Sequence, residues 1–225
     1  MKKRKLLIRW LCGCLIFFGC SRKSNEQQPE STTTLSTEDI AKARRIHAAL
    51  AECKKLIRGG DVVTRTGNDF TSQSLRTLNR RDKTFSHCGI ASMEHDSLFI
   101  YHALGGEYNP DQHLKRESFE AFSDPNDNVA TGIFRFDMPA KNKERLMAVA
   151  RELYVQKMRF DMDFDLKTDD KMYCAEFVYK SFLKATDSTI RFPHSIIRDF
   201  EFVGVDDIIL DPRSTKIAVL NYRLY

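Results

Sequence analysis

The most informative part of the sequence is Lys171-Met-Tyr-Cys-Ala-Glu-Phe-Val-Tyr-Lys-Ser-Phe-Leu183, whose apolar residues recur at the spacing of a buried helix. Thr168 or Asp170 is the expected N-cap, which places Cys174 in the first helical turn. The positive end of the helix dipole and the unpaired N–H groups of that turn favour a thiolate over a thiol. We therefore expect Cys174 to be a nucleophile if the chain supplies a base, and otherwise a small residue of the core.

Composition limits the classes of protein to consider. A chain of 225 residues with 42% hydrophobic residues fits one globular domain with extensions. The net charge of +5 is accounted for by basic residues close to the N-terminus, and the remainder is balanced. Because no basic run or basic-aromatic stripe follows, the sequence predicts no nucleic-acid partner.

Residues 1–20 have the pattern of an export signal. A basic segment precedes the apolar run 10–19, which is too short to cross a bilayer as a helix. Cys20 follows a glycine and precedes a Ser/Thr/Gln-rich segment, so the region resembles a bacterial lipoprotein signal with Cys20 as the lipidated residue. Cys14 is a second candidate for lipidation, and a plain secretory signal or an uncleaved anchor is the alternative. We expect a lipoprotein of the bacterial cell envelope, anchored to the membrane, with a flexible tether at 21–36.

The remaining sequence, 37–225, predicts one α+β domain. Two amphipathic helices precede the cysteine helix, and short segments of alternating or β-branched residues predict strands. The expected helices are 37–57 and 139–157, and the expected strands are 61–66, 85–93, 98–103, 132–137, 200–205 and 216–222. This order favours a small antiparallel sheet or half-barrel with the cysteine helix packed against it.

Two histidines lie on the predicted hairpin formed by the second and third strands. With Glu94-His95 as a two-residue loop, His87 faces His102 directly, and with a four-residue loop the two are diagonal neighbours. Either arrangement keeps both imidazoles on one face of the sheet, whereas an odd loop separates them. Gly89 lies beside His87 on that face and leaves room for a close approach. A cysteine at a helix N-terminus and a histidine oriented by a second polar group are the components of a thiol hydrolase.

Four motifs carry a resemblance to a known family: Gly60-Asp-Val-Val, Phe85-Ser-His-Cys-Gly-Ile, Tyr101-His-Ala-Leu-Gly-Gly and Tyr173-Cys-Ala-Glu-Phe-Val. In this order they resemble the circularly permuted papain-like hydrolases of the NlpC-type superfamily, in the YiiX/YebB-like branch related to lecithin retinol acyltransferase. The resemblance covers roughly residues 55–212. In that family the histidine strand precedes the cysteine helix, as it does here.

The resemblance implies a role for each site residue. Cys174 becomes the nucleophile and His87 the base, while His102 takes the place of a third polar residue that is often glutamate. Glu107 is a second candidate for orienting the base. Tyr173 is expected either to donate a hydrogen bond to an oxyanion or to pack as an aromatic residue. Another expectation is that His194 contacts substrate.

No cofactor or metal is predicted. Asp161, Asp163 and Asp165 alternate, but the remaining positions of a calcium-binding loop do not follow. The sequence also lacks the closely spaced Cys/His pairs of a zinc site. Cys53 and Cys88 are predicted either to form a disulfide in an oxidising compartment or to be buried free thiols.

Two classes of function follow. The first is a membrane-tethered cysteine hydrolase that cleaves an amide or ester bond through an acyl-enzyme on Cys174. Its substrate would be a small molecule, a peptidoglycan-type peptide or an acylated, lipid-like compound, and acyl transfer to an acceptor other than water uses the same site. The second is a ligand-binding lipoprotein in which the Cys/His pair is vestigial. In either class the chain is expected to be a monomer.

Overall fold

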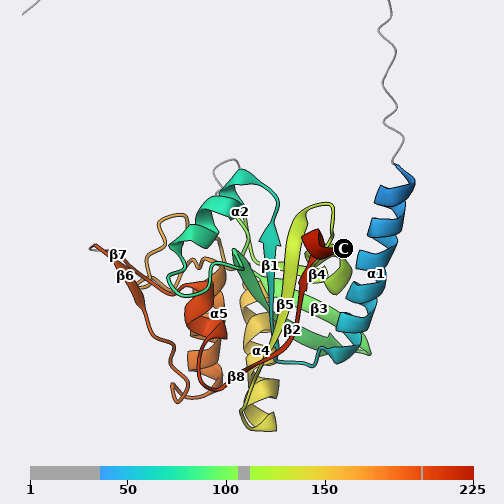
Figure 1. Ribbon diagram of the computed structural model, residues 1–225. Helices are drawn as coiled ribbons and strands as arrows, with labels where there is room; N and C mark the ends of the chain where they lie inside the picture. Colours follow the sequence, from blue (N-terminus) through green and yellow to red (C-terminus); the bar gives the residue numbers. More distant parts are fainter. Residues whose placement is uncertain (1–35, 106–111, 199) are drawn as a thin grey trace, which may run out of the picture. The chain divides into compact units, whose positions relative to one another are not determined.

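Antiparallel pairing joins six strands into one sheet with the order β4-β3-β2-β1-β5-β8 (Figure 1). The structure, a computed structural model, describes residues 36–105, 112–198 and 200–225. The strands of the sheet are β1 (Val62–Gly67), β2 (His87–Glu94), β3 (Ser97–His102), β4 (Lys115–Ser118), β5 (Asn128–Phe136) and β8 (Ser214–Asn221). A separate hairpin pairs β6 (Ser195–Ile197) with β7 (Phe200–Phe202).

Helices cover both faces of the six-stranded sheet, with α1 on one side and α4 and α5 on the other (Figure 1). This arrangement agrees with the predicted α+β class, but β4 and α6 were not predicted. The helices are α1 (Thr37–Leu56), α2 (Phe70–Leu75), α3 (Phe119–Phe122), α4 (Ala140–Val155), α5 (Cys174–Ala185) and α6 (Val205–Ile209), with short 3-10 turns η1 (Arg76–Leu78) and η2 (Tyr222–Leu224). Among the helices of the described residues, none has the length and apolar content needed to span a bilayer.

Helix α1 begins where the sequence predicts. The Ser36 hydroxyl accepts a hydrogen bond from the Asp39 backbone N–H, and the Asp39 carboxylate accepts one from the Ser36 N–H. Leu50 and Cys53 are among the residues that α1 buries against the sheet, whereas Ile40, in its first turn, is exposed. The helix therefore packs mainly through its C-terminal half.

The turn of the β2–β3 hairpin sets the register of the two histidine strands. Glu94 pairs with Ser97, which leaves His95 and Asp96 as the loop, and both have positive φ as a type I′ turn requires. This register makes His87 and His102 diagonal neighbours on one face, which is one of the two even arrangements expected. A Cβ atom on Gly89 would lie 2.9 Å from the His102 Cβ, so glycine is needed for this close approach.

Cys53 and Cys88 lie on opposite sides of the sheet. Cys53 belongs to the core between the sheet and α1, which also contains Ala91, whereas Cys88 belongs to the core under α4 and α5. Both thiols are free and buried, so the second of the two predicted alternatives is confirmed and the bridge is not formed. Side chains of a strand alternate between faces, and α1 covers the face of Ala91 rather than that of Cys88.

Candidate active site

Cys174 is the first residue of α5. Its N-cap is Tyr173, whose backbone N–H donates to the Glu176 carboxylate at 3.2 Å. The predicted caps are wrong: Asp170 instead pairs with Arg159 at 3.1 Å, and the Thr168 carbonyl accepts a hydrogen bond from the Lys180 ammonium. Because Cys174 is at the very start of the helix, its sulfur lies beside N–H groups that have no partner within the helix.

A second thiol and three backbone groups stabilise the Cys174 thiolate. The pKa of Cys174 lies below its ordinary value because the Cys88 thiol donates a hydrogen bond to the sulfur, although burial opposes the shift. The backbone N–H groups of Cys88, Ala175 and Cys174 itself lower the pKa further. The pKa of Cys88 moves the opposite way, well above its usual value, first because of burial and then because of the neighbouring sulfur. Cys174 is therefore the thiol of this pair that ionises.

Three side chains from adjacent strands form a hydrogen-bonded chain. His87 Nε2 on β2 lies 2.8 Å from His102 Nδ1 on β3, and His102 Nε2 lies 3.1 Å from a carboxylate oxygen of Glu117 on β4. The two imidazoles are buried, and their ring planes are nearly perpendicular. Glu117 was not predicted as a site residue. It bonds to His102, the residue expected to orient the base, while Glu107, the second candidate, lies outside the described residues.

The pKa values of the three hydrogen-bonded side chains leave one charge among them at neutral pH. Burial, followed by the charge of Arg65, holds the pKa of His87 well below its usual range. Burial likewise lowers the pKa of His102 to about 4, despite the hydrogen bond to Glu117. That same hydrogen bond lowers the pKa of Glu117, so both histidines are neutral and Glu117 is ionised.

This charge pattern determines which atom donates and which accepts in each of the two hydrogen bonds. An ionised carboxylate only accepts hydrogen bonds, so His102 Nε2 carries the proton that Glu117 accepts. His102 Nδ1 is then an acceptor, and His87 Nε2 must carry the proton between the two rings. The remaining nitrogen, His87 Nδ1, holds a lone pair and is the atom of these three side chains that can act as a base.

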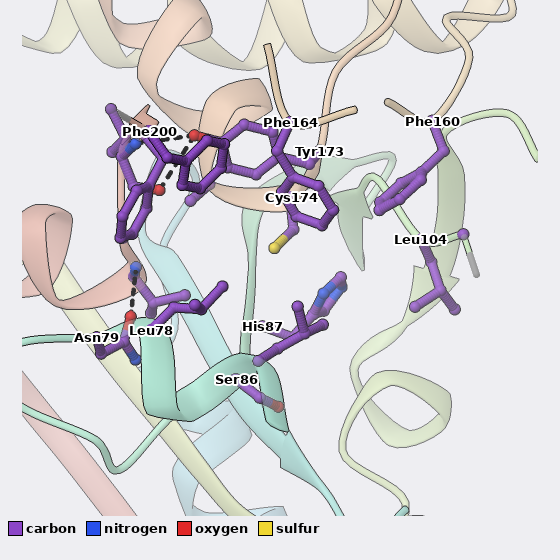
Figure 2. A pocket seen from close by; sticks show the side chains of 17 residues that line it. Leu78, Asn79, Ser86, His87, Leu104, Phe160, Phe164, Tyr173, Cys174 and Phe200 are labelled. Carbon is purple, nitrogen blue, oxygen red and sulfur yellow. Dashed lines mark hydrogen bonds between the residues drawn. The ribbon is translucent and has the colours of Figure 1, made fainter. Parts of the chain in front are cut away.

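Cys174 and His87 line one cavity from opposite walls (Figure 2). Within the described residues no hydrogen bond joins the thiol to the imidazole, and such catalytic contacts often tighten only when substrate binds. The rest of the lining is mostly apolar and comes from loops, α2, η1, β7 and α6: Leu75, Leu78, Leu104, Phe160, Phe164, Phe200, Phe202, Val203 and Val205. Substrate atoms between these walls would contact both reactive groups.

Tyr173 lines the same cavity but its hydroxyl is already paired. The hydroxyl donates to the Val203 carbonyl and accepts from the Val203 N–H at 2.8 Å, while the ring lies 4.9 Å from that of Phe164. Of the two roles expected for Tyr173, the structure therefore favours packing over oxyanion stabilisation.

His194 is not among the residues that line the cavity with Cys174. It lies just before β6, is exposed, and its Nδ1 is 2.7 Å from a Glu201 carboxylate oxygen. Pairing across the β6–β7 hairpin holds it away from the cysteine. Cys20, the predicted lipidation residue, lies outside the described residues.

The Asp161, Asp163 and Asp165 run forms a turn beside the cavity. The buried Asp161 carboxylate accepts the backbone N–H groups of Asp163 and Asp165 and pairs with Lys171 at 3.2 Å. The Asp161 carboxylate is thus satisfied by two backbone groups and a lysine. In the described part of the chain, no cluster of three or more His, Cys, Asp or Glu residues could hold a metal ion.

Comparison with known proteins identifies a structural relative. No family model matches the chain, and no curated protein compared with it matches either. The chain is similar to the crystal structure of the metalloprotein YiiX from Escherichia coli O157:H7, with a TM-score of 0.58 and 16% sequence identity. The alignment covers 72% of this chain and 96% of YiiX. At this identity the likeness shows the fold: the chain has a YiiX-like α+β fold, which confirms the predicted fold class.

Proposed function

We propose that this protein is a papain-like cysteine hydrolase that cleaves an amide or ester bond through an acyl-enzyme on Cys174. One observation carries the proposal: a cysteine with a lowered pKa shares a cavity with a histidine whose free nitrogen is fixed by a buried hydrogen-bonded chain. The YiiX-like fold is compatible with a hydrolase. Membership in the NlpC-type superfamily is part of the proposal and rests on the four sequence motifs.

The residues suggest an order of steps. His87 Nδ1 takes the thiol proton as the Cys174 sulfur forms a bond to the carbonyl carbon of the substrate. Backbone N–H groups at the start of α5 stabilise the resulting oxyanion. When the intermediate collapses, the carbon–nitrogen or carbon–oxygen bond breaks and the leaving group takes the proton from His87. Water, deprotonated by His87, then attacks the thioester, which releases a carboxylic acid and restores the thiol.

His102 and Glu117 support the step in which His87 gains a proton. A protonated His87 still donates through Nε2 to His102, and His102 still donates to the ionised Glu117. The carboxylate therefore stabilises the imidazolium through the intervening ring, as a third residue does in other triads. An acceptor other than water would make the same site an acyltransferase.

The setting of the enzyme is proposed from the N-terminal sequence. Lipidation at Cys20 would anchor the protein to a membrane of the bacterial cell envelope, with residues 21–36 as the tether. Labelling of the expressed protein with a radioactive fatty acid, compared with a Cys20→Ser variant, tests this part separately.

The catalytic proposal is tested by following acyl-enzyme formation with 4-nitrophenyl acetate. We expect intact-mass and peptide analysis to place the acetyl group on Cys174, and His87→Ala to slow acetylation by about 10² to 10⁴-fold, the usual contribution of a general base. Cys174→Ala should abolish the adduct, whereas Cys53→Ala, which changes a buried thiol on the other side of the sheet, should keep it. Acetylation that is insensitive to His87 would instead support the ligand-binding lipoprotein.

A further inference from the structure

Two cavities of opposite character meet at His87. The apolar slot is the cavity of about 60 Å³ described above, which contains Cys174 and is lined mostly by leucine, valine and phenylalanine. The polar basin is a neighbouring cavity of about 560 Å³ whose walls carry Arg65, Asp69, Lys115, Glu117 and Asp127. Both are lined by Ser86, His87 and Leu104, but only the slot is lined by Cys174.

The chemistry of acyl transfer assigns the two halves of a substrate to these cavities. The acyl group stays bonded to the sulfur after the first step, so it must lie in the cavity that Cys174 lines. The leaving group receives its proton from His87 Nδ1, the same nitrogen that took it from the thiol, so it must lie against the imidazole, at the residues that the slot and the basin share. The slot is thus suited to a compact apolar acyl group, and the basin to a polar leaving group.

Arg65 gives the basin a specific binding group. It lies directly opposite His87 in the β1–β2 pairing, and its guanidinium donates to the Phe122 carbonyl at 2.9 Å and lies over the Phe122 ring. Within the described residues no carboxylate forms an ion pair with Arg65, so most of its N–H donors are available. Arg65 is half-buried, and burial lowers the pKa of its guanidinium although nearby acidic groups, Glu117 foremost, favour the charged form.

The acidic residues of the basin favour the charged form of Arg65, but within the described residues none of them forms an ion pair with it. The Asp69 carboxylate caps α2 by accepting from the Ser72 N–H at 2.9 Å, and Glu117 accepts from His102. Lys115 lies 3.8 Å from Glu117. Asp127 lines the basin without forming an ion pair with Arg65. A planar guanidinium that is partly desolvated and lacks a carboxylate partner favours a carboxylate on the ligand.

We infer that the substrate is an amide or ester that joins a compact apolar acyl group, held in the slot, to a leaving group that bears a carboxylate, held in the basin by Arg65. This inference rests on the proposed function and adds the orientation and chemical class of the substrate. It also makes Arg65 a specificity-determining residue.

Four aryl esters test both halves of the inference on the full chain. They combine a phenylacetyl or a succinyl acyl group with 4-hydroxybenzoate or 4-hydroxybenzamide as the leaving group. Each kcat/KM is divided by the rate of hydrolysis of that ester by hydroxide, which removes differences in intrinsic reactivity. We expect the phenylacetyl ester of 4-hydroxybenzoate to be the best substrate, with the carboxylate preferred about 10-fold or more, as for a charge-assisted hydrogen bond.

Variants of Arg65 test whether this residue causes the preference for a carboxylate on the leaving group. Arg65→Gln should reduce the carboxylate-to-carboxamide ratio to near one, and Arg65→Lys should leave an intermediate ratio because an ammonium cannot form the bidentate contact. The ratio is read rather than the rate, since Arg65 also affects the pKa of His87. Arg145→Gln, which changes an exposed residue of α4 paired with Asp187, should leave the ratio unchanged.

The outcomes separate the two proposals. Acylation of Cys174 with a preference for succinyl esters, or with a carboxylate preference that survives in Arg65→Gln, would overturn the inference but leave the hydrolase intact. Failure of all four esters to acylate Cys174 would overturn the proposed function, and the inference with it.

Discussion

Cys174 and His87 line the same cavity, but different kinds of structure position them. Cys174 takes its environment from the start of α5, where its sequence neighbours Tyr173 and Ala175 provide the cap and an N–H group. His87 takes its environment from strand pairing, because its partners His102 and Glu117 come from β3 and β4. The position of the nucleophile is thus set by local sequence, although Cys88 of β2 lowers its pKa most, and the base is set by the register of three strands.

The two regions also lie on different faces of the sheet. Helix α5 packs on the face that carries Cys88, whereas His87, His102 and Glu117 project from the face that carries Ala91. They meet because His87 is the first residue of β2 and reaches the cavity at the end of the sheet. A one-residue slip of β2 or β3 would separate the two histidines and leave the nucleophile in place.

We expect the largest loss of activity from substitution of Glu117, the last residue of the hydrogen-bonded chain His87–His102–Glu117. In Glu117→Gln, the amide can donate to His102 Nε2, which reverses the chain and places a proton on His87 Nδ1. We expect kcat/KM for an acyl ester to fall by about 10²-fold, since the free base is lost. Glu117→Ala should lose less activity, because it removes the orienting charge without supplying a competing donor. The pH profile of kcat/KM measures both effects.

A glutamate elsewhere on the same sheet provides the control. Glu94 ends β2 and pairs with Arg116 at 2.6 Å, away from the histidines. Glu94→Gln should therefore reduce stability slightly and leave the pH profile unchanged. If Glu117→Gln and Glu94→Gln behave alike, Glu117 does not direct the protons, and His102 alone orients the base.

The same contrast explains which parts of the site the sequence could predict. The helical spacing of residues 171–183 placed Cys174 in a first turn, although the cap proved to be Tyr173. The alternation of β2 and β3 placed His87 and His102 on one face for any even loop. Both inferences needed only neighbouring residues or one hairpin, and both agree with the structure.

Glu117 and Cys88 required information that one sequence does not contain. Strand β4 has the sequence Lys115-Arg-Glu-Ser118, with no apolar residue to mark it as a strand, so its pairing with β3 was not foreseen. The alternation of β2 puts Cys88 on the face opposite His87, but which helix covers that face depends on the tertiary fold. Local pattern fixes the phase of a strand, and only packing decides what each face contacts.

A second, smaller effect is expected at Cys88, which couples the nucleophile to the sheet. Cys88→Ala removes the thiol that donates to Cys174 and should move the pKa of Cys174 upward. Alkylation of Cys174 by iodoacetamide at pH 7 should slow by about fivefold, the value of one ordinary hydrogen bond. Cys88→Ser retains a donor and should react more like the wild-type protein. Equal slowing in both variants would mean that packing, rather than hydrogen bonding, controls the thiol.

The smallest expected effect is on stability and concerns Glu176, which lies in the first turn of α5 beside Cys174. Burial raises the pKa of Glu176 to about 7, although Lys180 lies 2.9 Å away and favours the charged form. Since an unfolded chain ionises this group near 4.5, the folded protein holds an extra proton between these two values. The contribution of Glu176 to the free energy of unfolding therefore decreases as pH rises from about 4.5 to about 7, and is constant above that range. Glu176→Gln still accepts the Tyr173 N–H but cannot ionise, so urea unfolding should show the variant gaining stability relative to wild type from pH 5 to pH 8.

Glu152→Gln, which breaks an exposed pair with Lys184, should show little change over that range. A difference between Glu176→Gln and wild type that does not vary with pH would mean that Glu176 stays ionised beside Lys180, and that the cap at Cys174 is held by a charge.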